Sequence, residues 1–130
     1  MILLDTNICI YIINQKPPAV LDRFKGFSAG EIGISSVVAA ELAFGIQKTG
    51  SMRNRDALNL FLAPLSILPF DAGCVWAYGK LRAQLEKIGQ SIGALDTMIA
   101  AHALALGLPL VTNNQKEFAR VPGLRLENWV

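Results

Sequence analysis

The first residues of the chain constrain its fold more than any other stretch. Ile2–Leu4 is apolar at every position and runs directly into Asp5, and a second apolar segment follows from Ile8. A run this short and wholly apolar predicts a strand that is buried on both faces, as in the centre of a parallel sheet. The carboxylate of Asp5 then lies where a strand ends and a helix begins, which is the edge of α/β sheets at which ligands bind.

Apolar strands and helical periods alternate along the rest of the chain. We expect helices over residues 8–14, 17–25, 37–48, 52–65, 72–88, 97–106 and 115–120, and further strands at 31–35, 67–70, 108–112 and 124–126. The β-branched residues in 8–13 leave a strand as the alternative for the first helix. The alternation predicts an α/β fold with three layers, α/β/α, around a central, mostly parallel sheet of four to five short strands. We expect one domain over residues 1–130.

Composition excludes several classes of protein. Hydrophobic residues make up 52% of the 130 residues and the mean hydropathy is +0.40, which argues against disorder and predicts extensive burial within the chain or against a partner. No apolar run reaches the roughly 18 residues that a membrane span needs. No basic segment precedes the apolar start, so we expect no signal peptide and a cytoplasmic protein. Cys9 and Cys74 lie in apolar segments and are expected to be buried free thiols.

Basic and acidic residues are distributed differently along the chain. Lys and Arg gather in four segments, 16–25, 48–55, 80–87 and 116–125, and give a net charge of +2. Several acids instead stand alone among apolar residues. A basic periphery around acidic positions suits a protein that binds a polyanion, although solvated helix faces are the simpler explanation of the charge pattern alone.

Asp5, Glu41 and Asp96 each lie in long stretches without another charge. An ionised carboxylate among apolar side chains is unfavourable unless it is hydrogen-bonded or bound to a cation. Helix capping is a sufficient explanation for Asp5 or Asp96 taken singly, because both lie at expected helix starts. It does not explain Glu41, which falls about two turns inside its helix; the alternative there is an exposed position on an otherwise apolar helix.

The expected topology brings these acids together. Asp5 follows the first strand, Glu41 lies on the helix after the second, and Asn113 and Asn114 end the fourth, all at one sheet edge. If the helix of Asp96 begins at the same edge, three carboxylates converge there. They would repel one another and raise a pKa unless a divalent cation is bound. A site of oxygen ligands without His or Cys favours Mg²⁺ or Mn²⁺ over Zn²⁺. Such an ion can activate water for attack on a phosphodiester.

Four segments together resemble a known family. They are Leu-Asp-Thr-Asn at 4–7, Ser-Ser-Val-Val-Ala-Ala-Glu-Leu at 35–42, Ile-Gly-Ala-Leu-Asp-Thr-Met-Ile-Ala at 92–100 and Val-Thr-Asn-Asn-Gln-Lys-Glu-Phe at 111–118. In this order they resemble the PIN-domain ribonucleases, and the chain looks most like the VapC toxins of bacterial toxin–antitoxin pairs. The similarity extends to Leu-Glu-Asn-Trp at 126–129.

The resemblance implies a PIN-like fold and a Mg²⁺-dependent endoribonuclease, with Mn²⁺ as a substitute ion. Asp5 and Asp96 would bind the metal, and Glu41 would be the third acid of the site. The family often has a fourth acid where Asn114 stands in this sequence. Glu117 would then substitute for it, and because of this departure we expect one metal ion. Three neighbouring polar residues would orient the carboxylates or water, or would simply cap strand ends: Thr6, Asn7 and Thr112.

The resemblance also implies partners. A cognate antitoxin would cover the acidic cleft with a basic side chain, the toxin would form a homodimer within a toxin–antitoxin hetero-oligomer, and no membrane would be involved. The substrate would be structured RNA such as a tRNA anticodon loop, with Arg82, Lys87 and Lys116 as candidates to contact phosphates. His102 is expected to be a satisfied helix residue.

Two other functions are compatible with parts of the sequence. The first is an inactive PIN fold that binds RNA or a partner, which Asn114 in place of an acid would favour. The second is a phosphoacceptor receiver-type domain, because an Asp at a strand end can be phosphorylated. A receiver domain needs a paired acid beside the first strand and a lysine after the last, and the sequence has neither.

Overall fold

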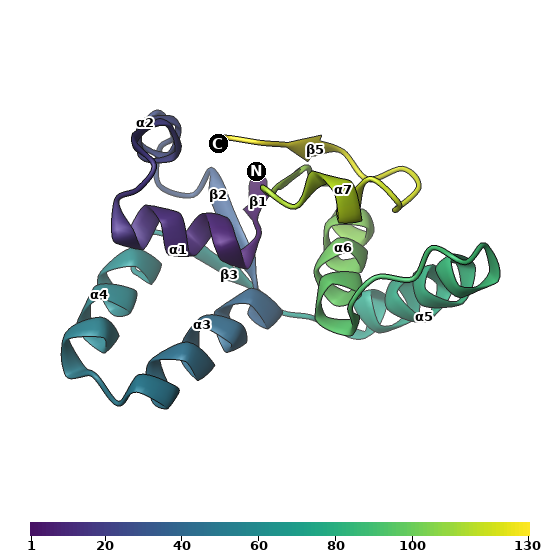
Figure 1. Ribbon diagram of the computed structural model, residues 1–130, viewed down its shortest axis with the longest axis horizontal. Helices are drawn as coiled ribbons and strands as arrows, with labels where there is room; N and C mark the ends of the chain where they lie inside the picture. Colours follow the sequence, from purple (N-terminus) through teal and green to yellow (C-terminus); the bar gives the residue numbers. More distant parts are fainter.

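The computed structural model of the protein describes all 130 residues, and its centre is a parallel sheet of five short strands (Figure 1). The strands are β1 (Ile2–Leu4), β2 (Ile32–Ser35), β3 (Ser66–Leu68), β4 (Leu110–Val111) and β5 (Leu126–Glu127). Their order across the sheet is β3-β2-β1-β4-β5, and every pairing is parallel. The predicted α/β fold with a parallel sheet is therefore confirmed.

The strand β1 is the middle strand, as its uniform apolar sequence predicts. It pairs with β2 through Ile2 and Ile32, and with β4 through Leu3 and Leu110. All three of its residues are buried, and Leu4 is completely inaccessible to solvent. A strand packed on both faces cannot accept polar residues, and this explains why the first charge of the chain comes only where the strand ends.

Seven helices connect and cover the strands. They are α1 (Thr6–Asn14), α2 (Pro18–Lys25), α3 (Ser36–Thr49), α4 (Met52–Leu62), α5 (Ala72–Lys87), α6 (Ala94–Leu106) and α7 (Gln115–Phe118). The helices α1 to α4 lie on the crossovers that step from β1 to β2 to β3, whereas α5 and α6 lie on the crossover that returns to β4. Right-handed crossovers in opposite directions place these two groups on opposite sides of the sheet, and Figure 1 shows them apart.

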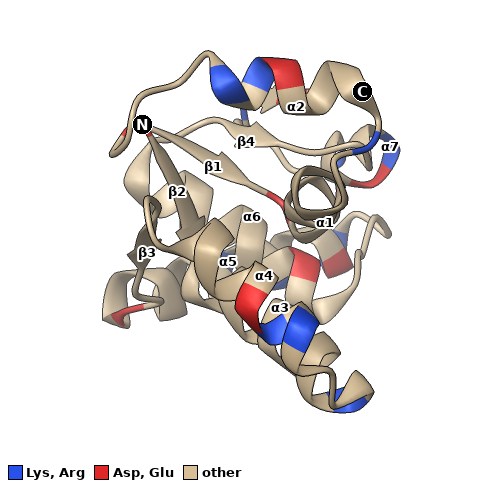
Figure 2. Cartoon of the chain, turned by 90° about the vertical axis from the view of Figure 1, so that its left-hand side faces the viewer, with Lys and Arg blue, Asp and Glu red and all other residues tan.

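The direction of the crossovers reverses between β1 and β4. In an open parallel sheet such a switch point leaves a crevice at the carboxyl ends of the two strands. Asp5 follows β1 there, and Thr112 follows β4. In Figure 2 an acidic segment separates β1 from α1 at this position. The fold therefore creates its ligand crevice where the sequence places its first acid.

Most element boundaries agree with the sequence-based predictions, and the exceptions have local causes. The helix α4 ends at Leu62, not at residue 65, because Pro64 has no N–H with which to continue the helical hydrogen bonds after Ala63. The strand β4 is shorter than predicted, because Pro109 has no N–H to donate to a neighbouring strand. The strand β3 ends at Leu68, two residues before predicted, and β5 begins two residues later than predicted, after the turn at Gly123. The segment 8–13 is helical, so the strand alternative is wrong.

The sequence of α5 has apolar residues at helical spacing, which predicts one buried face made of Val75, Tyr78, Leu81, Leu85 and Ile88. Val75 and Ile88 are more than half exposed, whereas Cys74, Leu81 and Leu85 are buried. Leu81 and Leu85 are buried as predicted, and the difference lies at the two ends of the stripe, in a helix that packs along α6 and not on the sheet. Both cysteines are free and buried, as predicted. No helix in the structure has the length and apolar character required to cross a bilayer.

Candidate active site

Asp5 is the most deeply buried acid of the chain, with 4% of its surface exposed. Its Oδ1 accepts a hydrogen bond of 2.7 Å from the backbone N–H of Thr6, and its Oδ2 accepts one of 2.7 Å from the Thr112 hydroxyl. Burial raises the pKa of Asp5, the two hydrogen bonds lower it, and the nearby Glu117 raises it, with a net increase. The residue caps α1, as the capping explanation predicts, yet its carboxylate also faces the other acids of the sheet edge.

Glu41 reaches the same edge from the second turn of α3. Its Oε1 accepts a hydrogen bond of 2.9 Å from the hydroxyl of Thr6, the residue directly after Asp5. Glu41 is only partly accessible to solvent, so the alternative of a freely exposed glutamate is wrong. The hydroxyls of Thr6 and Thr112 thus each hold one carboxylate of the site.

Asp96 lies in the first turn of α6 and not before it, because α6 begins at Ala94, three residues earlier than predicted. Gly93 occupies the cap position and makes no side-chain cap. The capping explanation for Asp96 is therefore wrong. Its carboxyl group instead interacts with that of Glu117, which contributes to raising the pKa of Asp96.

Four carboxyl groups interact at Asp96. Burial raises the pKa of Asp96 to about 7, with further contributions from the charges of Glu117, Asp5 and Glu41 and from the hydrogen bond with Glu117. Burial also acts to raise the pKa of Glu117, but hydrogen bonds from the Gly93 N–H, the Asn114 side chain and Asp96 outweigh it, so that this pKa is lowered. Asp96 therefore carries the proton that the pair shares.

Asn114 does not contribute a carboxylate, but it holds one. Its side-chain amide donates to Glu117 Oε2, and its backbone N–H donates to the Thr112 hydroxyl at 3.0 Å. The second oxygen of Glu117 accepts from the Gly93 N–H at 3.1 Å. These hydrogen bonds place Glu117 beside Asp96. Glu117 is the residue predicted to substitute for the acid that is missing at position 114.

The donors of this site fit a divalent cation of the Mg²⁺ type. They are carboxylate, hydroxyl and amide oxygens, the ligands of hard cations, with no histidine or cysteine among them. In the described arrangement no three His, Cys, Asp or Glu side chains are close enough to coordinate one ion together. Because the pKa of Asp96 is raised to about 7, binding a cation below that pH requires that Asp96 lose its proton, and the spacing of the acids requires that the carboxylates move closer.

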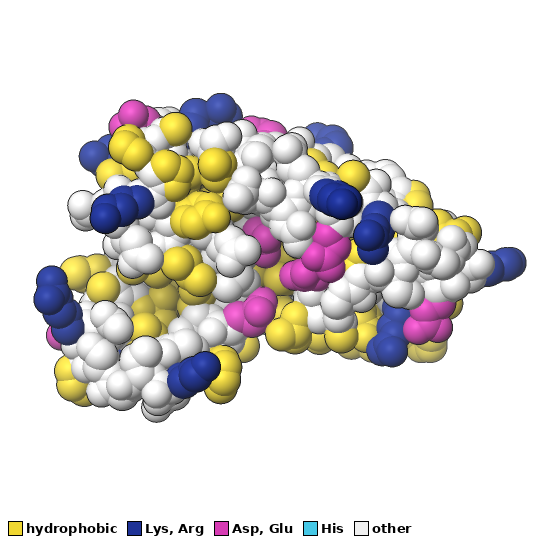
Figure 3. All heavy atoms as spheres, in the orientation of Figure 1, with side chains coloured by type: hydrophobic (Ala, Val, Ile, Leu, Met, Phe, Trp, Pro, Cys, Tyr) yellow, Lys and Arg dark blue, Asp and Glu magenta, His cyan; other side chains and the backbone are white.

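An open hollow of about 740 Å³ lies beside the acids. Thr6, Asn7 and Glu41 form its polar part, and Phe44 and Leu95 belong to its apolar wall. Asn7 is exposed and makes no side-chain hydrogen bond, so it lines the hollow without orienting a carboxylate. Figure 3 shows several acidic side chains near the centre of one face, with basic side chains both beside them and around the edge of that face.

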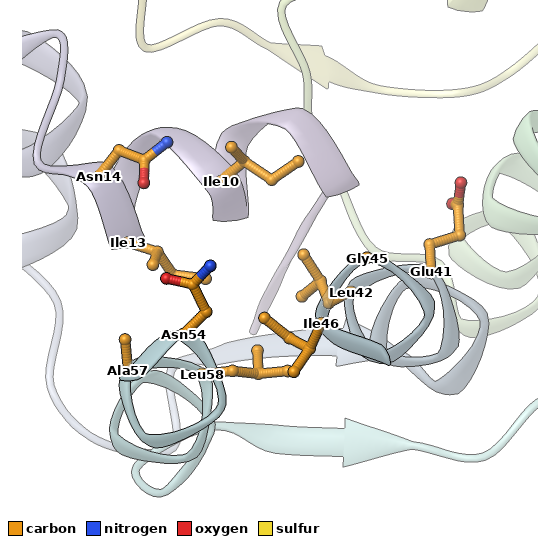
Figure 4. A pocket seen from close by; sticks show the side chains of 10 residues that line it. All are labelled: Ile10, Ile13, Asn14, Glu41, Leu42, Gly45, Ile46, Asn54, Ala57 and Leu58. Atoms are coloured by element: carbon orange, nitrogen blue, oxygen red, sulfur yellow. The ribbon is translucent and has the colours of Figure 1, made fainter. Parts of the chain in front are cut away.

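A second pocket, of about 200 Å³, adjoins Glu41 between α1, α3 and α4 (Figure 4). Its lining is mainly apolar, with Ile10, Ile13, Leu42 and Ile46, and Figure 4 shows the Glu41 carboxylate at one end, turned away from these side chains. Ile10 lines both this pocket and the larger hollow. The acidic site is therefore bordered by apolar surface.

His102 lies on α6 but takes no part in the site. It is buried, its Nδ1 lies 2.7 Å from the Ser35 hydroxyl, and its ring meets the edge of Phe70 at a centroid distance of 5.7 Å. Burial lowers the pKa of His102, although Asp71 opposes this. The expected structural role is supported by these contacts.

The basic candidates for phosphate contacts are exposed. Lys87 and Lys116 are solvent-accessible, and Arg82 lies 3.2 Å from Glu86 and donates to the Tyr78 hydroxyl at 2.9 Å. Sequence reasoning missed Gly93, whose N–H binds Glu117, because a backbone donor leaves no sign in a residue pattern.

Comparisons with known proteins agree with this arrangement. The family model described as PIN domain matches residues 2–124. The chain is 46% identical to ribonuclease VapC2 of Rickettsia felis and 43% identical to the tRNA(fMet)-specific endonuclease VapC of Shigella flexneri, and in both alignments 98% of this chain and 96% of the relative are covered. A crystal structure of VapBC2 from Rickettsia felis bound to a DNA fragment from its promoter contains a chain that superposes with a TM-score of 0.91, 44% identity and complete coverage of both chains.

Proposed function

The chain belongs to the PIN-domain family and is a nuclease of the VapC type, and we propose that it is a Mg²⁺-dependent endoribonuclease that acts as the toxin of a toxin–antitoxin pair. PIN-domain VapC ribonucleases generally depend on a divalent metal; that the ion is Mg²⁺, with Mn²⁺ as a substitute, is part of the proposal. The observation that carries it is the meeting of four carboxyl groups at the switch point of the sheet, where burial and, after it, their mutual repulsion raise the pKa of Asp96 to about 7.

Asp5 and Asp96 are the proposed metal ligands, and Glu41 is the third acid. When bound, the ion would supply an activated water and would stabilise the negative charge that develops on the attacked phosphodiester. Glu117 is the proposed fourth acid of the site. Asn114 has no carboxylate, whereas Glu117, held by the Asn114 side chain, brings a carboxylate to Asp96. We propose a single metal ion, because only Asp5 and Asp96 are its proposed ligands and because Asn114 stands where the family often has a fourth acid.

The supporting residues position these acids. Thr112 donates its hydroxyl proton to Asp5 and accepts the Asn114 N–H, so one side chain fixes both Asp5 and the loop that holds Glu117. Thr6 fixes Glu41 in the same way. The loss of a hydrogen bond to a metal ligand typically lowers metal affinity or activity by about 10- to 100-fold.

Asp96 and Glu117 control the proton at the site. With a pKa of about 7, the Asp96 carboxyl group keeps its proton in weakly acidic solution and loses it in weakly basic solution. Only the ionised form provides a ligand for a cation. We therefore expect the affinity for the ion and the cleavage rate to rise with pH through about 7.

The relatives suggest the substrate and partners. One of them is specific for tRNA(fMet), and another is part of a VapBC complex that binds DNA. By analogy we propose that the substrate is a structured RNA such as tRNA, and that an antitoxin covers the acidic cleft with a basic side chain. The apolar pocket beside Glu41 suits a segment that presents apolar residues next to that basic one.

Exposed apolar side chains are consistent with further assembly. Trp76 on α5 is 80% exposed and Phe44 on α3 is 68% exposed, although large apolar residues are usually covered. We propose that the chain forms a homodimer and, with its antitoxin, a hetero-oligomer in the cytoplasm. Sedimentation of the purified protein alone and with the antitoxin would measure both.

Two isosteric variants test the proposed activity. Asp5→Asn and Asp96→Asn should each reduce Mg²⁺-dependent cleavage of tRNA by at least about 10²-fold while the circular dichroism spectrum keeps the parent shape. Asp56→Asn, which alters an exposed acid on α4, is the matched control and should cleave like the parent. Parent-like cleavage by either site variant would refute the assignment. A parent protein that binds RNA without cutting it would favour the inactive binding module, for which Asn114 in place of an acid is the argument.

A further inference from the structure

Three side-chain amides and one phenol hydroxyl meet on the rim of the acidic site. Asn128 Nδ2 lies 3.3 Å from Asn113 Oδ1 and 3.5 Å from Gln115 Oε1, and Asn113 Nδ2 lies 3.4 Å from the Tyr11 hydroxyl. We call Asn113, Gln115, Asn128 and the Tyr11 hydroxyl the amide cluster. These residues come from α1, from the segment after β4 and from the segment after β5.

The contacts within the amide cluster are long. Hydrogen bonds between N–H and O usually measure about 2.9–3.0 Å, whereas these measure 3.3–3.5 Å. Asn113 and Gln115 are also exposed to solvent. A polar group that only stabilised the fold would be expected in shorter, better shielded contacts. The donors and acceptors of the cluster are therefore available to exchange partners with a ligand.

The cluster adjoins the residues that hold the acids along the chain. Asn113 stands between Thr112, which binds Asp5, and Asn114, which binds Glu117. A single peptide unit thus separates the amide of Asn113 from the residue that orients the proposed metal ligand. A nucleotide whose phosphate lay at the carboxylates would carry its own base, or that of its neighbour, onto this rim.

Asn128 is held in place on both sides. Glu127 forms an ion pair with Arg23 at 3.3 Å, and Trp129 is buried and stacks on Phe27 with a centroid distance of 5.4 Å. The Asn128 Oδ1 accepts the N–H of Val130 at 3.0 Å, so that its NH₂ group is turned towards the other amides. An amide fixed in this way loses little freedom when it binds, which is a property of recognition groups.

We propose that the amide cluster recognises the base of the nucleotide next to the bond that is cleaved. This inference rests on the proposed function. Side-chain amides present a donor and an acceptor together and therefore match the edge of a base that does the same, as in the pairing of Asn or Gln with adenine. Bases are accessible in this way in single-stranded RNA loops. The cluster would then set sequence preference, while the acids carry out the chemistry.

The test measures base preference and not activity alone. Four short RNAs differing only in the nucleotide on one side of the cleaved bond, and four differing on the other side, are cleaved by the parent protein. The kcat/KM values should differ by about tenfold or more between bases on one side, since one well-placed amide–base pair discriminates by this order. In Asn113→Ala and Asn128→Ala that ratio should fall at least fivefold, and both variants should retain measurable cleavage.

Asn59→Ala is the matched control, because Asn59 is an exposed amide on α4 whose side chain forms no hydrogen bond in the structure. It should keep the parent preference. A purely structural role for Asn128 would lower the melting temperature and slow cleavage of all eight RNAs equally, which would overturn the inference. Equal cleavage of all eight RNAs by the parent would overturn it as well. If the parent cuts no RNA under any condition, the proposed function fails first and the inference fails with it.

Discussion

Replacing Asp96 by asparagine should stabilise the metal-free protein at pH 8, although it removes a proposed metal ligand. The pKa of Asp96 is raised from 3.8 to about 7 by burial and by the charges of Glu117, Asp5 and Glu41. Above pH 7 the folded protein therefore contains a carboxylate in surroundings that favour its neutral form. Asparagine has nearly the same shape, carries no charge, and keeps an N–H that can donate to Glu117.

The size of the effect follows from the pKa. Each pKa unit corresponds to about 1.4 kcal/mol of difference between the two protonation states, so the rise from 3.8 to about 7 gives an upper bound of about 4 kcal/mol. Asp96 is partly exposed, and solvent and salt screen its interactions. We therefore expect a gain of about 1–2 kcal/mol in the free energy of unfolding. For a chain of this size, that gain raises Tm by roughly 3–10 °C.

The assay is thermal unfolding followed by circular dichroism in EDTA, at pH 8 and at pH 4.5. Because the folded-state pKa is raised, the stability linked to the Asp96 proton is fully present below about pH 4 and is lost as the pH rises to about 7. The difference between Asp96→Asn and the parent should therefore be largest at pH 8 and small at pH 4.5. Asp56→Asn, on the exposed side of α4, should show no such change between the two pH values.

Adding Mg²⁺ should reverse the order at pH 8. A ligand that binds only the folded state stabilises it, so the parent should gain Tm with increasing Mg²⁺ whereas Asp96→Asn should gain little. A variant no more stable than the parent in EDTA at pH 8 would show that the Asp96 carboxylate does not destabilise the fold, and equal stabilisation of both proteins by Mg²⁺ would show that Asp96 does not bind the ion.

Three further predictions concern neighbouring groups. Thr112→Val removes the hydroxyl that binds Asp5 and Asn114 at a fully buried position. It should lower the free energy of unfolding, measured in urea titrations, by about 1–3 kcal/mol, and it should lower the cleavage rate by about 10- to 100-fold. A variant with the stability and the cleavage rate of the parent would contradict this role of Thr112. Glu117→Gln keeps the shape but removes the charge, so kcat should fall at least about tenfold; parent-like kcat would exclude Glu117 from the site. Cys9 is buried, and burial and the charge of Asp5 raise the pKa of its thiol. Iodoacetamide should therefore alkylate Cys9 only after the protein unfolds, as measured by intact-mass spectra. Rapid alkylation of Cys9 in the native protein would disprove this.

Much of the site could be predicted because its signals are local. The apolar run before Asp5 identifies a central strand, and the isolation of Asp5, Glu41 and Asp96 among uncharged residues marks acids that need a special environment. Parallel topology then places the ends of β1 and β4 together, which brings Thr112 to Asp5. These inferences depend only on hydrophobic period and on sheet geometry.

Other features depend on contacts that a sequence pattern does not contain. Asp96 interacts with Glu117 because α6 begins at Ala94. The sequence does not indicate this helix start, since Gly93 provides no side-chain cap there. The support of Glu117 by Asn114 depends on a particular side-chain conformation. Val75 is exposed and its neighbour Cys74 is buried in a helix that packs against α6. The apolar period of the sequence does not decide which of these two neighbouring residues is covered.

The contacts of the amide cluster were also beyond prediction. Tyr11 and Asn113 are separated by 102 positions in the chain, and no rule of spacing relates them. Asn128 acquires its orientation from the burial of Trp129 and the ion pair of Glu127, which are properties of the folded chain end. Tertiary packing therefore decides the periphery of the site, whereas local sequence decides its centre.

We propose that carboxylates from distant parts of the chain bind one cation at the switch point of the sheet. Crystals of the protein grown with Mn²⁺ at pH 8 test this most directly through the anomalous signal of the ion. We predict one strong peak between Asp5 and Asp96, at roughly 2.0–2.3 Å from a carboxylate oxygen of each, with Glu41 and Glu117 nearby. A well-ordered site without such a peak, or a peak bound only elsewhere on the protein, would contradict the account.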